Sequence, residues 1–155
     1  MKFKNLLLLL LLFLPLHKEV FAMDNRTVLA RIIFAEAAGE NYLGKVAVAW
    51  VVKNRVYSKK FPNTYENVIY QPWQFTGVNS LLWKKTFYPK KLNPRELTSW
   101  QDAQKIAKEV IEGRISDPTK GADHYYSIII PIPKWAKKMQ VTAKIGKHTF
   151  FKSGA

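Results

Sequence analysis

The sequence predicts an α+β fold, mainly helical, with a small antiparallel β-sheet toward the C-terminus. Between residues 24 and 56, and again from residue 93 to 112, apolar residues recur with the spacing of amphipathic helices. After residue 121 the pattern changes to β-branched and aromatic runs, two of which flank a glycine-containing turn. Helices that come first and strands that follow are typical of an α+β domain rather than an alternating α/β domain.

Two helices are predicted first, and the second of them should be the buried centre of the domain. Asp24 or Asn25 can cap the first helix, which runs to about Ala38. The second helix covers residues 42–56 and is apolar on nearly every side, so we expect it to be buried. Its inner stripe follows the spacing i, i+3, i+4, i+7, i+8 and consists of Leu43, Val46, Ala47, Trp50 and Val51.

The middle of the chain is predicted to hold a short helix, a turn-rich segment and a long helix. The short helix lies near residues 65–70, and residues 71–77 form turns. Residues 79–96 are predicted to be irregular. The dipeptide Asn93-Pro94 then marks the start of a long helix that ends near Glu112. Its inner stripe consists of Trp100, Ala103, Ala107, Val110 and Ile111.

The last third of the chain is predicted to form the sheet. Residues 124–130 are β-branched and aromatic, which favours a strand, and the prolines that follow end it. Residues 141–145 and 148–151 read as a hairpin with Gly146 at its tip.

The first 22 residues have the pattern of a secretory signal peptide. Lys2 and Lys4 precede an apolar run over residues 6–16, and Val20-Phe21-Ala22 resembles a cleavage site. The run is short for a membrane-spanning helix, so a retained anchor is the less favoured alternative. We therefore expect export to the periplasm or the cell exterior, with residues 23–155 as the catalytic domain.

The composition of the chain disfavours metal sites built from cysteine or histidine. The chain has no cysteine, and beyond residue 22 its only histidines are His124 and His148. Neither belongs to a His-x-x-x-His or His-Glu-x-x-His pattern, so a zinc peptidase or zinc amidase is disfavoured. We expect no metal and no cofactor.

The chain is strongly basic. Its formal charge is +14, and removing residues 1–22, which carry three lysines and one glutamate, leaves +12. Such an excess favours a polyanionic partner. For an exported protein we expect an anionic envelope polymer or membrane surface rather than nucleic acid.

Glu36 is the candidate catalytic residue, because it follows an apolar helical stripe and lies on the same face. That stripe consists of Val28, Leu29, Ile32 and Ile33. A carboxyl group there loses part of its hydration, which favours its protonated form, and a protonated carboxyl can act as a general acid. The alternative is a buried glutamate paired with one of the many basic residues. Small neighbours, Ala35 and Ala37 to Gly39, would let a ligand approach closely.

Several blocks of the sequence form an ordered set of motifs. They are 30–40 (ARIIFAEAAGE), 44–56 (GKVAVAWVVKNRV), 61–64 (FPNT), 68–72 (VIYQP), 74–76 (QFT), 121–126 (GADHYY) and 145–151 (IGKHTFF). In this order, over residues 27–151, they resemble the SleB-type cell-wall hydrolases, a family named for the spore-cortex lytic enzyme. The resemblance implies a lysozyme-like or lytic-transglycosylase-like domain that cleaves the glycan strands of peptidoglycan. It implies that Glu36 is the catalytic acid, that 1,6-anhydromuramic ends form, and that peptidoglycan is the partner. We expect a monomer, because nothing in the sequence suggests otherwise.

Further residues are candidates for substrate binding. Gln74, Phe75 and Thr76 lie on a loop where polar groups can bind sugar hydroxyls or simply hold the turn. Tyr125 and Tyr126 can offer aromatic faces to a pyranose ring or pack in the core. Because they alternate on a predicted strand, only one should face the cleft. The sixth candidate is Glu40.

Three alternative functions stay open. A hydrolytic glycosidase normally needs two carboxylates, and Glu40 would be the second if it faced the cleft. We expect Glu40 instead to lie beyond the helix end, in a turn or a salt bridge. The chain could also be a non-catalytic wall-binding module, although its retention of Glu36 argues against this. A basic secreted nuclease using His124 or His148 lacks a metal-ligand cluster.

Overall fold

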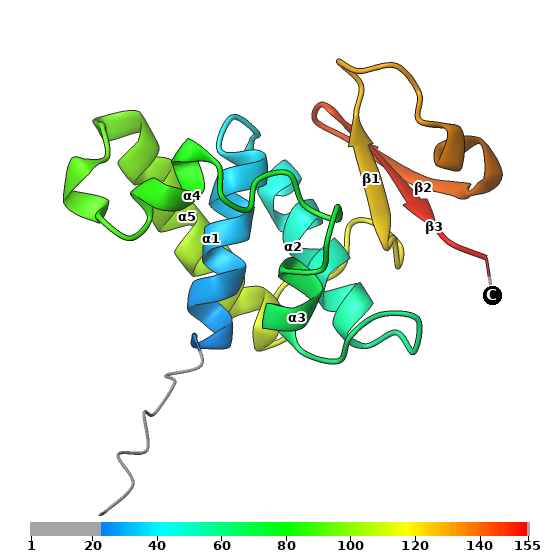
Figure 1. Ribbon diagram of the computed structural model, residues 1–155, viewed down its shortest axis with the longest axis horizontal. Coiled ribbons are helices and arrows are strands. Elements are labelled where there is room, and N and C mark those ends of the chain that lie inside the picture. Colours follow the sequence, from blue (N-terminus) through cyan, green and yellow to red (C-terminus); the bar gives the residue numbers. More distant parts are fainter. Residues whose placement is uncertain (1–22, 155) are drawn as a thin grey trace, which may run out of the picture.

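The computed structural model describes residues 23–154, and the predicted signal segment 1–22 lies outside the described residues. Helices form one part of the molecule and a three-stranded sheet forms the other (Figure 1). The helices are α1 (Asn25–Ala37), α2 (Tyr42–Val56), α3 (Tyr65–Ile69), α4 (Leu81–Lys85) and α5 (Pro94–Ile111). Helices followed by a small antiparallel sheet confirm the predicted α+β class. Within residues 23–154, no helix combines the length and apolar character needed to cross a membrane.

The core forms around α1, which packs against α2, α3, α4 and α5. The predicted apolar stripe of α1 is completely buried, and so is most of α2. Leu43 is an exception, since half of its surface is exposed, and Trp50 is only partly buried. The stripe predicted for α2 was therefore wrong at its first position, since Gly44 and Lys45 are the buried residues of the first turn of that helix.

The helix ends follow the predicted capping residues. Asp24 accepts a hydrogen bond from the Thr27 N–H at 3.2 Å and caps α1. Asn93 and Glu96 form a reciprocal capping box at the start of α5, with Pro94 in the first turn. Gly113 follows the end of α5 with a φ of +73°, a conformation that glycine adopts without strain.

The segment predicted to be irregular contains an additional helix. Ser80 caps α4 by accepting a hydrogen bond from the Trp83 N–H at 3.1 Å. Trp83 is buried and meets Tyr70 edge-on, with 5.8 Å between the ring centroids. The prediction for 79–96 was therefore wrong over α4, because burial of Trp83 stabilises a helix too short to show a periodic pattern.

The sheet consists of β1 (His124–Ser127), β2 (Gln140–Ile145) and β3 (His148–Lys152), in the antiparallel order β1-β3-β2. The hairpin of β2 and β3 was predicted correctly. The predicted extension of β1 to Ile130 was wrong, because Ser127 pairs with His148, the first residue of β3, and later residues have no strand beside them. A short helical turn, η2 (Lys134–Lys138), precedes β2.

A buried carboxylate fastens the end of β3 to the start of β1. Asp123 accepts hydrogen bonds from the Ser153 N–H at 2.9 Å and from the Ser153 hydroxyl at 2.5 Å, and it lies 2.8 Å from Nδ1 of His124. Burial raises the pKa of Asp123 and is the largest single effect. The bonds with His124 and Ser153 together outweigh it and lower the pKa from 3.8 to about 2.

We predict that this carboxylate makes part of the protein's stability acid-sensitive. A group whose pKa is lower in the folded chain stabilises the fold above its unfolded pKa, and the effect is lost as pH falls through the folded pKa. The stabilisation should therefore be complete above about pH 4 and gone near pH 2. Thermal unfolding of the wild type and of Asp123→Asn should show a difference in Tm that shrinks over this window. A difference that stays constant would contradict the assignment.

Candidate active site

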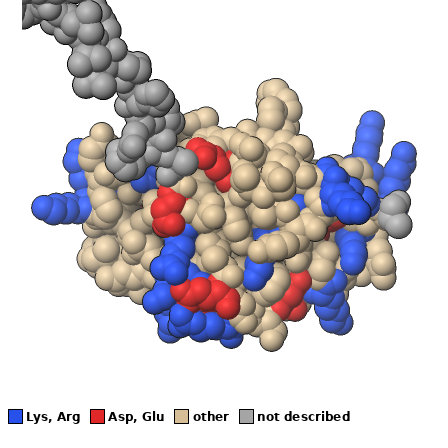
Figure 2. Space-filling view, turned by 90° about the horizontal axis from the view of Figure 1, so that it is seen from below, with Lys and Arg blue, Asp and Glu red and all other residues tan. Residues whose placement is uncertain are grey.

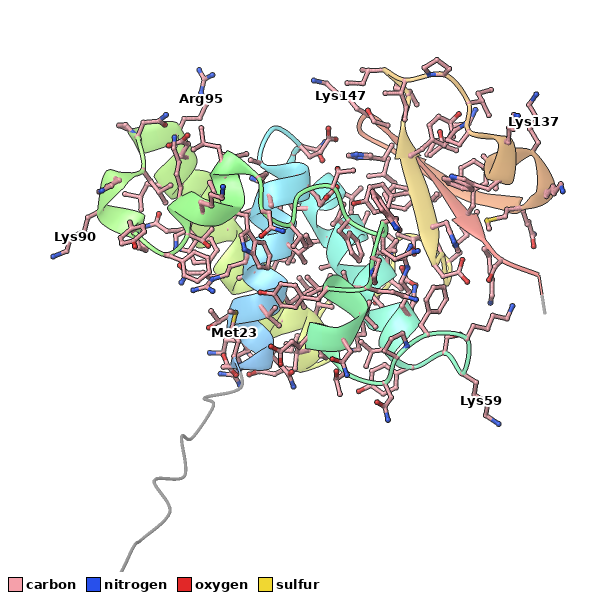
Figure 3. All side chains as sticks on the ribbon, in the orientation of Figure 1. Met23, Lys59, Lys90, Arg95, Lys137 and Lys147 are labelled. Carbon is pink, nitrogen blue, oxygen red and sulfur yellow. The ribbon has the colours of Figure 1, made fainter. Side chains whose placement is uncertain are left out.

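A cleft of about 640 Å³ opens between the helical part and the sheet. One wall comes from the end of α1 and the turn after it, and the loop before α4 forms another. The far wall comes from β1, the segment after it and the tip of the hairpin (Figure 3). The polar and charged side chains that line it are Glu36, Glu40, Arg55, Gln74, Thr76, Tyr125, Tyr126, Ser127, Lys147 and His148.

Glu36 lies in the last turn of α1, where the apolar stripe of the helix reaches the cleft. Its Oε1 accepts a hydrogen bond from the backbone N–H of Gly77, and the Thr76 hydroxyl lies 3.5 Å away. Its Oε2 accepts a hydrogen bond from the Tyr125 hydroxyl at 2.9 Å. A helix, a loop and a strand therefore fix this carboxyl group while it remains partly exposed to the cleft.

Gly77 makes the approach of the loop to Glu36 possible. A Cβ at this position would lie 2.7 Å from Oε1 of Glu36 and 2.9 Å from Cβ of Ala35, closer than such atoms pack. Only glycine lets the backbone N–H reach the carboxylate at this point. From the sequence, Gly77 was expected to lie in a turn and was not marked as a site residue.

Tyr125 holds the other oxygen of Glu36. Burial, and then the charge of Glu36 and the hydrogen bond to it, raise the pKa of the Tyr125 hydroxyl well above its ordinary value. The phenol therefore keeps its proton and acts as a donor at neutral pH. Its ring packs edge-on against His148, with 5.1 Å between centroids, and against Phe150.

Arg55 brings a cation to the floor of the cleft. Its Nε donates to the Asp123 carbonyl at 2.6 Å, which braces the end of α2 against the start of β1. Burial lowers the pKa of Arg55, while the nearby Tyr125, Asp123 and Glu36 oppose that shift. An arginine starts from so high a pKa that it stays charged at neutral pH. It thus supplies positive charge near Glu36.

Phe75 does not line the cleft. It is 6% exposed and packs in the core, where the Arg55 guanidinium lies 4.9 Å from its ring centroid. Phe75 thus anchors the loop while its neighbours Gln74 and Thr76 line the cleft, and its contact with substrate stays a prediction.

Glu40 lies in the turn after α1, lines the cleft and is held by the sheet. Its Oε2 accepts a hydrogen bond from the backbone N–H of Lys147 at 3.0 Å, and Nδ1 of His148 lies 4.0 Å away. Gly44 and Gly146 leave room for this side chain, since a Cβ on either would collide with it. Burial lowers the pKa of His148, against the opposing charges of Glu40 and Glu36, so this imidazole is neutral at neutral pH.

Both tyrosines of β1 line the cleft, although alternation predicted only one. Tyr125 faces Glu36, while Tyr126 stacks on Phe151 and meets Trp135 edge-on. The cleft continues past the edge of β1 to Trp135, so it also reaches the second face of the strand.

The structure adds lining residues that the sequence did not mark. Trp73 is fully exposed, with a φ of +65°, on the loop rim. Trp135 and Lys147 lie on the opposite wall. Nδ1 of His124 lies 2.8 Å from Oδ1 of Asp123, at the start of β1. Among residues 23–154, no three His, Cys, Asp or Glu side chains gather as a metal-binding group.

Comparison with known proteins identifies the family. The sequence profile of a family described as cell wall hydrolase matches residues 39–151, most of the chain. The chain belongs to the cell wall hydrolase family. The matched region of this hydrolase domain begins three residues after Glu36, and it includes the loop and the strands that surround that residue.

Relatives and solved structures agree with the assignment. The spore cortex-lytic enzyme of Bacillus cereus is 35% identical over 132 residues, which are 85% of this chain and 46% of that enzyme. The enzyme of the same name from Bacillus subtilis is 32% identical, over 84% of this chain and 38% of its own length. This cell wall hydrolase chain thus spans less than half the length of these relatives.

The solved structure of the catalytic domain of the germination-specific lytic transglycosylase SleB from Bacillus anthracis has a TM-score of 0.66 and 34% identity to this chain. The match covers 86% of this chain and 98% of that domain. The catalytic domain of Bacillus cereus SleB has a TM-score of 0.61 and 33% identity, and the match covers 86% and 94%. The cell wall hydrolase fold seen here therefore corresponds to domains that were solved apart from the rest of their chains.

Proposed function

We propose that this chain is a peptidoglycan lytic transglycosylase in which Glu36 is the single general acid and base. One observation carries the proposal: the carboxyl group of Glu36 is fixed by Gly77 and Tyr125 at the wall of an open cleft. The similarity to catalytic domains of that activity supports it. An exported location, in the periplasm or outside the cell, and action as a monomer are part of the proposal.

The reaction needs one proton donor that later accepts a proton. Protonated Glu36 gives its proton to the glycosidic oxygen, and the bond from that oxygen to the anomeric carbon of the muramic residue breaks. The resulting Glu36 carboxylate takes the proton of the muramic 6-hydroxyl, whose oxygen bonds to the same anomeric carbon. The product is a 1,6-anhydro sugar, the acid is regenerated, and no water is consumed.

The surroundings of Glu36 suit both steps. The Gly77 N–H and the Tyr125 hydroxyl hold the carboxyl group in one orientation, so little reorganisation is needed between the two proton transfers. The Arg55 cation lies near the carboxylate that forms in the first step. Gln74, Thr76 and Tyr126 are proposed to contact the sugar residues beside the scissile bond.

Glu40 favours the lyase over a two-carboxylate hydrolase. One of its oxygens is already used by the Lys147 N–H, and the side chain is only 8% exposed. A carboxylate held in this way is poorly placed to activate a water molecule on the opposite side of a sugar ring. Its proposed role is to fasten the hairpin tip to the turn after α1.

The proposal predicts that residues 23–155 cut glycan strands and leave the stem peptides intact. Purified peptidoglycan incubated with this domain should lose turbidity and release soluble muropeptides without a rise in free amino groups. A rise in free amino groups would show cleavage of amide bonds and would contradict the proposal. Pelleting of the protein with unchanged peptidoglycan would instead indicate a binding module.

A further inference from the structure

The segment after β1 exposes a group of isoleucines that do not pack in the core. The exposed fractions of Ile128, Ile129, Ile130 and Ile132 are 59%, 79%, 50% and 60%. Single exposed apolar residues are ordinary on a protein surface, whereas a contiguous patch usually marks an interaction site. We call residues 128–132 the isoleucine loop.

Two backbone hydrogen bonds hold the isoleucine loop in place. The N–H of Ile128 donates to the Lys147 carbonyl at 2.8 Å, and the N–H of Ile130 donates to the Ser127 carbonyl at 3.1 Å. The loop therefore continues from β1 beside the hairpin tip (Figure 1).

The segment of the chain that carries the loop has charges of one sign. From residue 124 to the C-terminus the sequence has six lysines and no aspartate, glutamate or arginine. The lysines are exposed, and they are Lys134, Lys137, Lys138, Lys144, Lys147 and Lys152. Lys147 is hydrogen-bonded through its backbone to the isoleucine loop. The helical turn η2, which carries Lys134, Lys137 and Lys138, comes shortly after the loop in the chain. Lysine side chains project from the sheet end of the molecule in Figure 2.

We propose that the isoleucine loop and the lysines around it form a docking surface for an anionic phospholipid membrane. Exposed aliphatic side chains enter the interfacial region of a bilayer, while lysines beside them contact the anionic headgroups. Two signals of this kind together give a more stable attachment than either alone. The exposed Trp73 on the opposite rim of the cleft is of the residue type enriched at membrane interfaces.

Other occupants account for only part of the surface. A glycan strand is bound by hydrogen bonds and aromatic faces, and isoleucine offers neither; Ile128 and Ile132 do not line the cleft. A soluble anionic polymer would account for the lysines but not for the isoleucines. A second copy of the chain would bring like charges together.

The docking surface adjoins the cleft, because Ile129 and Ile130 also line it. A chain attached in this way would hold Glu36 close to the membrane surface. It would therefore cut the layers of the wall nearest the membrane before the outer layers. This inference goes beyond the proposed function, and its test does not depend on catalysis.

The test is sedimentation of residues 23–155 with vesicles. This domain is suitable because its described core lies within residues 28–151 and related catalytic domains were solved alone. Vesicles of equal parts phosphatidylglycerol and phosphatidylcholine should bind at least about tenfold more protein than pure phosphatidylcholine vesicles, and less as salt rises. The double variant Ile128→Ser, Ile132→Ser should lower binding at least about fivefold and leave cleavage of isolated peptidoglycan unchanged.

Matched variants separate the two signals. Leu43→Ser with Leu81→Ser removes two exposed apolar side chains from the helical part and should bind vesicles like the wild type. Lys137→Gln with Lys138→Gln should weaken binding to the anionic vesicles. Equal binding by the isoleucine variant and the wild type would overturn the proposal, as would absence of vesicle binding. A wild-type dimer in sedimentation that the isoleucine variant abolishes would assign the surface to a second copy instead.

Discussion

Glu36→Gln is expected to abolish measurable cleavage of peptidoglycan, with a loss in rate of about 100-fold to 10⁴-fold. Glutamine has nearly the shape of glutamate, and its carbonyl oxygen can still accept the hydrogen bond from the Gly77 N–H. It has no acidic proton to give to the glycosidic oxygen, so the first step of the reaction loses its catalyst. The measurement is the initial rate of dye release from labelled peptidoglycan.

The control for this variant is the same substitution at a distant site. Glu66 lies in the first turn of α3, outside the cleft, and Glu66→Gln should keep the wild-type rate. Circular dichroism should show that both variants fold, and Glu36→Gln should still pellet with insoluble peptidoglycan. If Glu36→Gln kept more than a tenth of the wild-type rate, another residue would have to be the acid.

Gly77→Ala is expected to lower kcat by about 10-fold to 100-fold with little change in KM. The added Cβ would lie 2.7 Å from Oε1 of Glu36 and 2.9 Å from Cβ of Ala35. Either the loop or the carboxyl group must move, and the hydrogen bond from the Gly77 N–H weakens. A displacement of about 1 Å at a catalytic group can cost a factor of about 100.

Gly154→Ala is the matched control, because a Cβ at that position meets nothing within 4 Å. A rise in KM without a fall in kcat would show that Gly77 shapes substrate binding and does not position the acid. A wild-type rate in Gly77→Ala would show that the loop N–H has no part in catalysis.

The sequence alone predicted the helices and turns that depend on residues close to one another in the chain. The bounds of α2, the capping of α5 by Asn93 and the hairpin around Gly146 all depend on residues within a few positions of one another. The end of β1 could not be predicted in this way. Residues 128–130 have the composition of a strand, but they lack a partner because β3 begins at His148.

The site could be predicted only in part, for the same reason. The position of Glu36 on an apolar face is a local pattern, and it marked this residue from the sequence alone. Its partners Gly77 and Tyr125 are 41 and 89 positions away, and only the fold brings them together. Phe75, between the polar residues Gln74 and Thr76, faces the core, where its ring meets Arg55 of α2.

The most direct test of the central claim is mass spectrometry of the soluble fragments released from peptidoglycan by residues 23–155. Our account predicts muropeptides that end in 1,6-anhydromuramic acid, because the muramic 6-hydroxyl replaces water as the nucleophile. Fragments with reducing ends, heavier by one water molecule, would contradict it. They would show that a second group activates water, and Glu40, the other carboxylate of the cleft, would be the first residue to substitute.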